Sequence, residues 1–151
     1  MRKEQKGFSL IELLIVVAII LIIAAIAIPN LLRSKMAANE ASAVGSMRTL
    51  NTASVAYSTT YGTYPPSIAA LGPATSPSST AADLIDSVLA SLTKSGYTFA
   101  FTAGTGNLSY SVTASPSTPG VTGQRYFYTD QSGVIRANTA GAADSSSTPI
   151  S

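Results

Sequence analysis

Apolar residues are concentrated in one uninterrupted stretch near the N-terminus. Phe8 to Ile28 reads FSLIELLIVVAIILIIAAIAI, in which Glu12 is the one formal charge. An α-helix rises about 1.5 Å per residue, so this stretch is long enough to cross a hydrocarbon core of roughly 30 Å. Pro29 follows it, and because proline lacks an N–H and clashes with the carbonyl four residues earlier, we expect a helix kink there. The pattern predicts a transmembrane helix over residues 8–29.

After Pro29 the pattern becomes that of an amphipathic helix. Apolar side chains recur at steps of three, four and seven residues, as they do on one face of a helix. They are Leu32, Met36, Ala43, Met47, Leu50 and Tyr57. We therefore expect the helix to continue over residues 30–62 and to pack one stripe of its surface on a globular domain.

Residues 63–138 are predicted to form that domain. A proline-rich connection at 63–80 precedes a short helix at 81–92, for which Thr80 is the candidate N-cap. Beyond it, apolar and polar residues alternate with period 2, which predicts antiparallel strands joined by tight turns. The strands are expected at 96–102, 107–113, 125–129 and 133–137. The fold class is thus α+β: a long N-terminal α-helix packed on a small antiparallel β-sheet of about four strands.

The C-terminal tail and the aromatic residues of the sheet complete this picture. Residues 139–151 have too little apolar content to order themselves, so we expect a flexible tail rich in Ser and Thr. The aromatic residues of the strands are expected to form the sheet core and cross-strand pairs. They are Tyr97, Phe99, Tyr110, Tyr126, Phe127 and Tyr128.

Charge is distributed unevenly along the chain. The net charge is +2, and residues 1–7 account for it, with Arg2, Lys3 and Lys6 against Glu4. The remainder carries equal numbers of basic and acidic residues, so no concentrated basic patch indicates a specific nucleic-acid partner. Lys and Arg beside an apolar span stay cytoplasmic, and the charged start therefore predicts the orientation of the span.

The sequence contains no Cys and no His, which excludes disulfides, thiolate zinc sites and catalysis by a Cys or His side chain. Asp83 and Asp86 are interpreted as a solvated surface near a helix start rather than a catalytic pair. Asp130 to Gly133 is interpreted as a β-turn, with a calcium site as the alternative. Asn107 is interpreted as a turn residue, with N-glycosylation as the alternative. We predict no enzymatic activity, no cofactor and no metal.

The junction before the apolar span is the most informative motif. It reads KGFSLIE, from Lys6 to Glu12. A secretory signal peptide has its small-residue cleavage site after the apolar region, whereas here Gly7 precedes that region. Cleavage after Gly7 would remove the leader peptide 1–7 and leave the apolar helix on a mature chain that begins at Phe8.

This segment resembles the class III signal of type IV prepilins and of the related pseudopilins of type II secretion. The resemblance extends from Lys3 to about Tyr64 and includes Pro29, where many family members have a proline. It implies that a membrane-embedded prepilin peptidase cuts after Gly7 and methylates the new amino group of Phe8. It further implies a homopolymer formed through the N-terminal helix, with the assembly machinery of the inner membrane as a partner.

Glu12 needs an explanation within the apolar span. A carboxylate in hydrocarbon costs about 2.5 to 3.5 kcal/mol even on the milder insertion scale, so it requires a partner or an exit to the interface. The resemblance implies that the partner is the N-terminal ammonium of Phe8 of a neighbouring subunit. The alternative is that Glu12, close to the start of the span, reaches the lipid headgroups by itself.

The function expected from the resemblance is that of a structural subunit. The precursor would be a single-pass protein of the bacterial inner membrane with its leader in the cytoplasm, and the product an extracellular type IV pilus-like filament. The first alternative is a periplasmic pseudopilin of a type II secretion system. The second is a monomeric surface binding module, for which Glu12→Ala would leave localisation and function unchanged.

Overall fold

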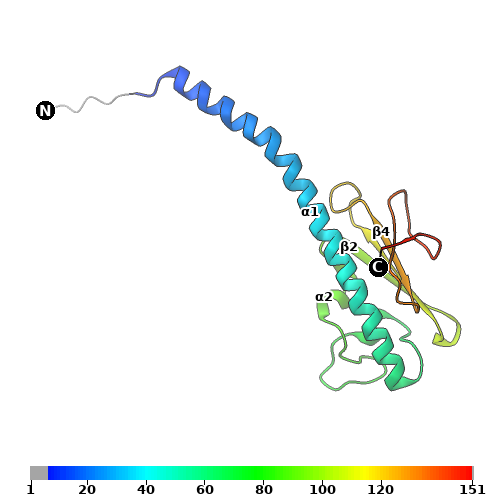
Figure 1. Ribbon diagram of the computed structural model, residues 1–151. Helices are drawn as coiled ribbons and strands as arrows, with labels where there is room; N and C mark the ends of the chain where they lie inside the picture. The colour runs from blue at the N-terminus through cyan, green and yellow to red at the C-terminus, as the bar shows by residue number, and fades with distance from the viewer. Residues whose placement is uncertain (1–6, 151) are drawn as a thin grey trace. The chain divides into compact units, whose positions relative to one another are not determined.

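The computed structural model describes residues 7–150, so most of the expected leader peptide, residues 1–6, and Ser151 lie outside the described part of the chain. The chain divides into two compact units, Met1–Lys35 and Met36–Ser151, which are described separately (Figure 1). The elements in chain order are α1 (Leu10–Tyr61), η1 (Ile68–Leu71), α2 (Ser87–Ala90), β1 (Thr93–Lys94), β2 (Tyr97–Ala103), η2 (Thr105–Asn107), β3 (Tyr110–Pro116), β4 (Tyr126–Asp130), β5 (Arg136–Asn138) and β6 (Thr148–Pro149).

The first unit consists of the N-terminal part of α1. This helix contains a stretch that is long and apolar enough to cross a membrane, and none of that stretch is buried within the chain. Pro29 lies inside α1, and because it has no N–H, the carbonyl of Ala25 lacks its intrahelical donor at this turn. The helix expected from the apolar run is therefore confirmed, whereas the kink at Pro29 stays a prediction.

In the second unit, α1 buries one stripe of its surface against the sheet. Four members of the expected stripe are buried, because they recur on the face that packs on the strands; they are Ala43, Met47, Leu50 and Tyr57. Leu32, by contrast, is 49% exposed. The helix ends at Tyr61, and Gly62 follows it with φ +81°. A glycine in this left-handed conformation commonly terminates a helix.

All six strands pair antiparallel in chain order, so the sheet is a meander. In the central register Phe99 lies opposite Ala114, which lies opposite Phe127. Side chains of alternate residues on β2, β3 and β4 are buried in one core with α1. The expected aromatic core is confirmed for Tyr97, Phe99, Tyr110 and Phe127. It is wrong for Tyr126 and Tyr128, which are half-buried on the opposite face of β4.

The expected number of strands, about four, is corrected to six within residues 7–150. The two additions are the short edge strands β1 and β6. The expectation of a flexible tail is also corrected for its described residues: β6 pairs with β5, and Ile150 N–H donates to the Ile135 carbonyl over 2.9 Å. Backbone hydrogen bonds to β5, together with burial of Ala143, order a segment whose apolar content alone is too low to do so.

The expected helix at 81–92 is wrong. Only α2 is helical, and its N-cap is Asp86, whose carboxylate accepts from Leu89 N–H over 2.6 Å, rather than Thr80. Upstream of it, Ala82 N–H donates to the Ala70 carbonyl and Leu84 N–H donates to the Leu71 carbonyl. These partners satisfy backbone groups that a helix would otherwise have paired, so this segment lies along η1 instead of coiling.

Candidate processing and assembly site

The predicted cleavage point lies in an exposed segment without regular secondary structure, immediately before α1. Gly7 and Phe8 are both exposed, and the Phe8 residue retains 83% of its accessible surface. A Cβ atom added to Gly7 would meet nothing within 4 Å, and its φ is not in the left-handed region. The fold therefore does not require glycine at position 7. If Gly7 is required, the requirement comes from recognition by another molecule.

Ser9 and Glu12 form the start of the helix. Ser9 N–H donates to Oε2 of Glu12 over 2.8 Å, while Leu13 N–H donates to the Ser9 carbonyl over 3.2 Å. A Ser at the N-cap whose backbone N–H is bound by a Glu three residues later is one half of a capping box. A negative charge in the first turn also interacts favourably with the positive end of the helix dipole. The carboxylate of Glu12 is thus directed back toward the N-terminus of α1.

This geometry places the Glu12 carboxylate at the start of α1, close along the chain to the predicted cleavage point. The nitrogen of Ser9, which binds Glu12, is one residue along the chain from the nitrogen of Phe8, which cleavage after Gly7 would convert to an amino group. Within residues 7–150 the ion pairs are Lys94–Asp86 and Arg125–Glu40, so Glu12 is in neither. Its carboxylate therefore has a hydrogen-bond donor in this structure but no cationic partner among the described residues.

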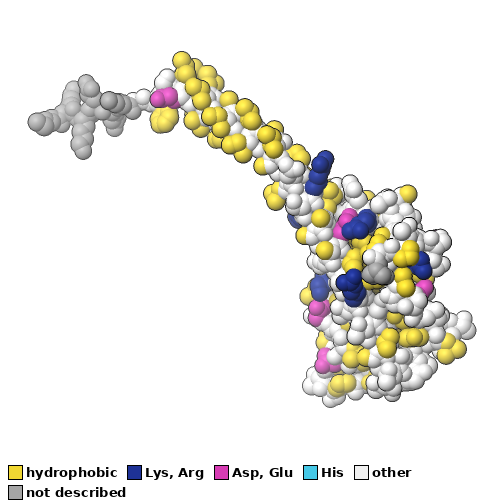
Figure 2. Space-filling view, in the orientation of Figure 1, with side chains coloured by type: hydrophobic (Ala, Val, Ile, Leu, Met, Phe, Trp, Pro, Cys, Tyr) yellow, Lys and Arg dark blue, Asp and Glu magenta, His cyan; other side chains and the backbone are white. Residues whose placement is uncertain are grey.

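The helix beyond Glu12 offers a continuous apolar surface. Figure 2 shows hydrophobic side chains along the visible face of this part of α1. Leu13, Leu21 and Ile26 are 59%, 64% and 64% exposed, and they lie on different sides of the helix. An apolar surface of this extent is characteristic of lipid contact or of packing against other helices. This surface is therefore suited to insertion into a membrane and to association with other helices.

A second polar cluster, which the sequence analysis did not identify, lies in the globular unit. The Oε1 atom of Glu40 accepts hydrogen bonds from Gln124 N–H over 2.8 Å and from Arg125 N–H over 3.1 Å. Its Oε2 atom accepts from Arg125 Nε over 2.7 Å. Burial by itself raises the pKa of the Glu40 carboxyl, but these donors outweigh burial and lower it below its ordinary value of 4.5. Glu40 is therefore a buried anion that ties the segment before β4 to α1.

Neighbouring contacts complete this attachment. Asn39 donates from its side-chain amide to the Thr122 carbonyl over 2.8 Å, and the Tyr97 hydroxyl donates to the Arg125 carbonyl over 2.8 Å. A Cβ atom at Gly123 would overlap the Tyr97 hydroxyl, so glycine is required there. The available sequence signal was the position of Glu40 between Met36 and Ala43 on the otherwise apolar stripe, since an acid at such a position is buried and needs a partner.

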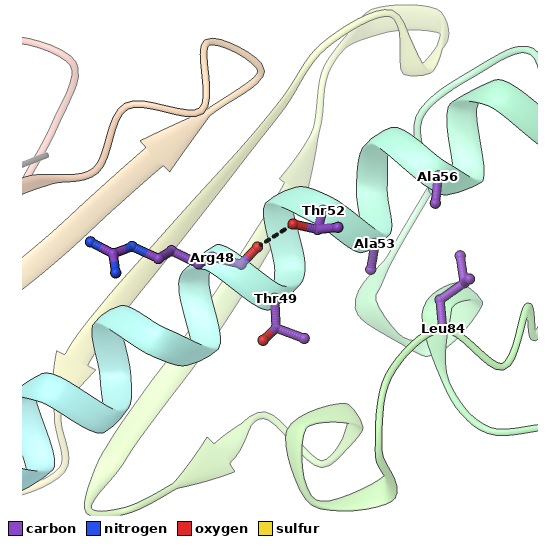
Figure 3. Close-up of a pocket in the computed structure, with 6 residues that line it drawn as sticks. All are labelled: Arg48, Thr49, Thr52, Ala53, Ala56 and Leu84. Carbon is purple, nitrogen blue, oxygen red and sulfur yellow. Dashed lines mark hydrogen bonds between the residues drawn. The ribbon is translucent and has the colours of Figure 1, made fainter.

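An open hollow of about 370 Å³ lies against α1 beside Leu84 (Figure 3). The hydroxyl of Thr52 donates to the Arg48 carbonyl over 3.0 Å and that of Thr49 donates to the Gly45 carbonyl over 3.1 Å. Both hydroxyls are thus engaged by the helix backbone. The side chain of Arg48 extends away from Leu84, as Figure 3 shows. The hollow therefore presents no convergent set of available polar groups.

The turn interpretations of Asp130 and Asn107 are confirmed. Asp130 accepts from Ser132 N–H through its side chain and from Gly133 N–H through its carbonyl, both over 2.9 Å. Asn107 has φ +55°, and its N–H donates to the Gly104 carbonyl over 2.9 Å. Asn and Asp tolerate such turn conformations better than most residues do.

Comparison with known proteins agrees with the N-terminal geometry. Residues 2–28 match the family model described as the prokaryotic N-terminal methylation motif. Over 38 residues the chain is 60% identical to the type IV wide pilus major component PilA4 of Thermus thermophilus, a match that covers 25% of this chain and 29% of that protein. No solved structure matches the chain. The N-terminal segment of this protein therefore carries the prokaryotic N-terminal methylation motif, and over a short stretch it is similar to a type IV pilus subunit.

Proposed function

We propose that this protein is the precursor of a structural subunit of an extracellular type IV pilus-like filament. The observation that carries the proposal is the exposed Gly7–Phe8 junction, which lies directly before an apolar, unburied stretch of α1 that extends to Ile28 and has Glu12 as its one charge. In this function, prepilin peptidase cleaves after Gly7 and methylates the amino group of Phe8. The mature chain then polymerises through its N-terminal helix.

The apolar surface of α1 explains why assembly is energetically feasible. In the precursor, lipid covers the helix, and the basic residues of the leader keep the start of the chain on the cytoplasmic side of the inner membrane. In the filament, helices of other copies replace the lipid. Because the apolar surface leaves one apolar environment for another, water does not contact it at either stage and the main cost of extracting the helix is avoided.

Glu12 couples processing to assembly in this proposal. Before cleavage the nitrogen of Phe8 is an uncharged peptide nitrogen, so it cannot neutralise a carboxylate. Cleavage creates an ammonium there, and pairing it with Glu12 of a neighbouring subunit offsets the cost of keeping that carboxylate out of water. Pro29 would provide a weak point at which α1 can bend as subunits pack.

Mass spectrometry of material sheared from the cell surface tests the proposal. The expected result is a chain that begins at N-methylated Phe8, in filaments composed mainly of this protein. Gly7→Leu should leave the uncleaved precursor in the membrane, because the fold does not require glycine at this position. Gly141→Ala is the matched control, since a Cβ atom there also meets nothing within 4 Å, and it should be processed normally.

Two results would contradict the proposal in different ways. An intact N-terminus in the membrane, with nothing sheared, would leave a single-span surface protein. A chain processed at Phe8 but confined to the periplasm would instead support a pseudopilin of a type II secretion system. The location of the processed chain therefore distinguishes the filament subunit from both alternatives.

A further inference from the structure

A polar hollow of about 280 Å³ lies in the globular unit, where the ends of β2, β3 and β4 meet. Its lining includes six residues with polar side chains: Thr102, Ser109, Ser111, Tyr128, Asp130 and Gln131. Those on the strands alternate with buried residues, so their side chains lie on the face of the sheet opposite to α1. The hollow is therefore separate from the helix and from the cluster around Glu40.

Strand register assembles this set from distant parts of the sequence. Thr102 on β2 lies opposite Ser111 on β3, which lies opposite Asp130 on β4. At the end of the β2–β3 hairpin, a Cβ atom on Gly104 would overlap the hydroxyl of Ser109. Glycine at this position thus leaves room for the Ser109 side chain beside the other hydroxyls.

The polar groups of the hollow are largely available to a ligand. Among residues 7–150, the side chains of Thr102, Ser109, Ser111 and Gln131 form no hydrogen bond with the protein, whereas the Tyr128 hydroxyl faces the Asp130 carboxylate. Asp130 uses Oδ1 to accept from Ser132 N–H, so a sugar hydroxyl would share its carboxylate with the Tyr128 hydroxyl. Convergent polar groups without protein partners are characteristic of a binding site, and they differ from the engaged threonines beside Leu84.

We propose that this hollow binds a single ring of a neutral carbohydrate. A sugar ring presents hydroxyls that both donate and accept, and the hydroxyls of Thr102, Ser109 and Ser111 can do the same. The carboxylate of Asp130 accepts from sugar hydroxyls, and the ring of Tyr128 offers a surface to the apolar face of a sugar. The volume is slightly below the usual range of about 300 to 1,000 Å³ for ligand pockets, which suits one ring rather than an oligosaccharide.

Charge and protonation favour a neutral ligand over an ion. A calcium site uses several carboxylate or carbonyl oxygens, whereas Asp130 is the single carboxylate of the lining, and the described residues contain no group of three or more His, Cys, Asp or Glu side chains that could hold a metal ion. The same carboxylate disfavours an anion. Burial and the adjacent Asp130 charge raise the pKa of Tyr128, so its hydroxyl remains a donor at neutral pH.

NMR titration of the full-length chain tests the proposal, in micelles of a detergent without a sugar headgroup. The probes are the methyl glycosides of glucose, galactose, mannose and N-acetylglucosamine. At least one should bind in the millimolar range and shift the backbone amides of residues 102, 109–111 and 128–131. Tyr128→Phe and Ser111→Ala should each weaken binding about fivefold, the effect of one hydrogen bond. Ser115→Ala, on the same sheet face but outside the hollow, should leave the affinity unchanged.

Three outcomes would overturn the proposal. The first is that no glycoside shifts these amides at millimolar concentration, and the second is that Tyr128→Phe and Ser111→Ala bind as tightly as the unaltered chain while retaining its amide spectrum. The third is that calcium chloride shifts the same amides at a lower concentration than any glycoside, which would identify a cation site. Because the titration uses unassembled chains, its result does not depend on filament formation.

Discussion

Replacement of Glu40 by Gln tests whether the buried carboxylate holds the segment before β4 on α1. The amide side chain has nearly the same shape but places an NH₂ group or a weaker acceptor against the Arg125 guanidinium. The charge-assisted bond of 2.7 Å to Arg125 Nε is lost, and the two backbone bonds to Gln124 and Arg125 keep only an uncharged acceptor.

The magnitude follows from burial and from the partners. Hydrogen bonds to charged groups contribute about 1.5 to 3 kcal/mol. The Arg125 side chain is 40% exposed, however, so in the variant water can hydrogen-bond to the guanidinium in place of the Glu40 carboxylate and reduces the loss of stability. The Glu40 side chain is 11% exposed, so its own bonds are less screened. We expect the free energy of unfolding to fall by about 2 kcal/mol, which lowers the melting temperature of a unit of this size by roughly 8 °C.

Circular dichroism during heating, on full-length protein in micelles, measures this change. The pKa of Glu40 is lowered in the folded state, so its contribution is fully present above the ordinary value of 4.5 and is lost as the pH falls through the folded-state pKa. The difference in melting temperature between Glu40→Gln and the unaltered chain should therefore be largest near neutral pH and shrink in acid.

Asp83→Asn is the control for the loss of one carboxylate. Asp83 is exposed with φ +55°, a conformation that Asn tolerates, so its stability should change by less than about 0.5 kcal/mol. Equal melting temperatures of Glu40→Gln and the unaltered chain at neutral pH would refute the assignment of Glu40 as a stabilising buried anion. A difference that persists undiminished in acid would refute its ionisation as the cause.

Two further substitutions and one titration test other parts of the structure. Glu12→Gln should reduce sheared filaments by tenfold or more, by the loss of about 1.4 kcal/mol or more from each subunit contact, with unchanged melting of the globular unit. Gly123→Ala should lower the free energy of unfolding by about 2 kcal/mol in urea titrations, because its Cβ atom overlaps the buried Tyr97 ring. Ultraviolet titration should include Tyr110 among the tyrosines that ionise late, near pH 12, because burial and the neighbouring Tyr64 raise its pKa to about 12.

Each of these has a control or a contradicting result. Filaments at normal yield from Glu12→Gln would contradict the proposed role of the charge pair in assembly. Asp83→Asn is the control, because it also removes one exposed carboxylate. Gly141→Ala has no clash and should match the unaltered chain in urea. Tyr110→Phe should reduce the amplitude of the late titration by one tyrosine, and an unchanged amplitude would contradict the raised pKa of Tyr110.

The N-terminal helix could be predicted from the sequence because its signal is local, and the proposed processing site is inferred from equally local signals. An apolar run longer than a bilayer core is apolar on every side, so no tertiary partner is needed to identify it. The Gly7–Phe8 junction and Glu12 are likewise adjacent in the chain. The stripe through Met47 and Leu50 was also visible, since residues three or four apart lie on one face of a helix whatever that face contacts.

Tertiary structure decided the features that depend on partners distant in sequence. Residues 81–86 have a helical pattern, but the carbonyls of residues 70–72 satisfy their backbone and hold them alongside η1. The tail has little apolar content, yet pairing with β5 orders β6. Glu40 finds its donors 84 and 85 residues away, and the hydroxyls of the polar hollow converge only through strand register. The pattern along the chain shows which face of a helix or strand is apolar or polar, whereas only the tertiary structure determines which residues pack against that face.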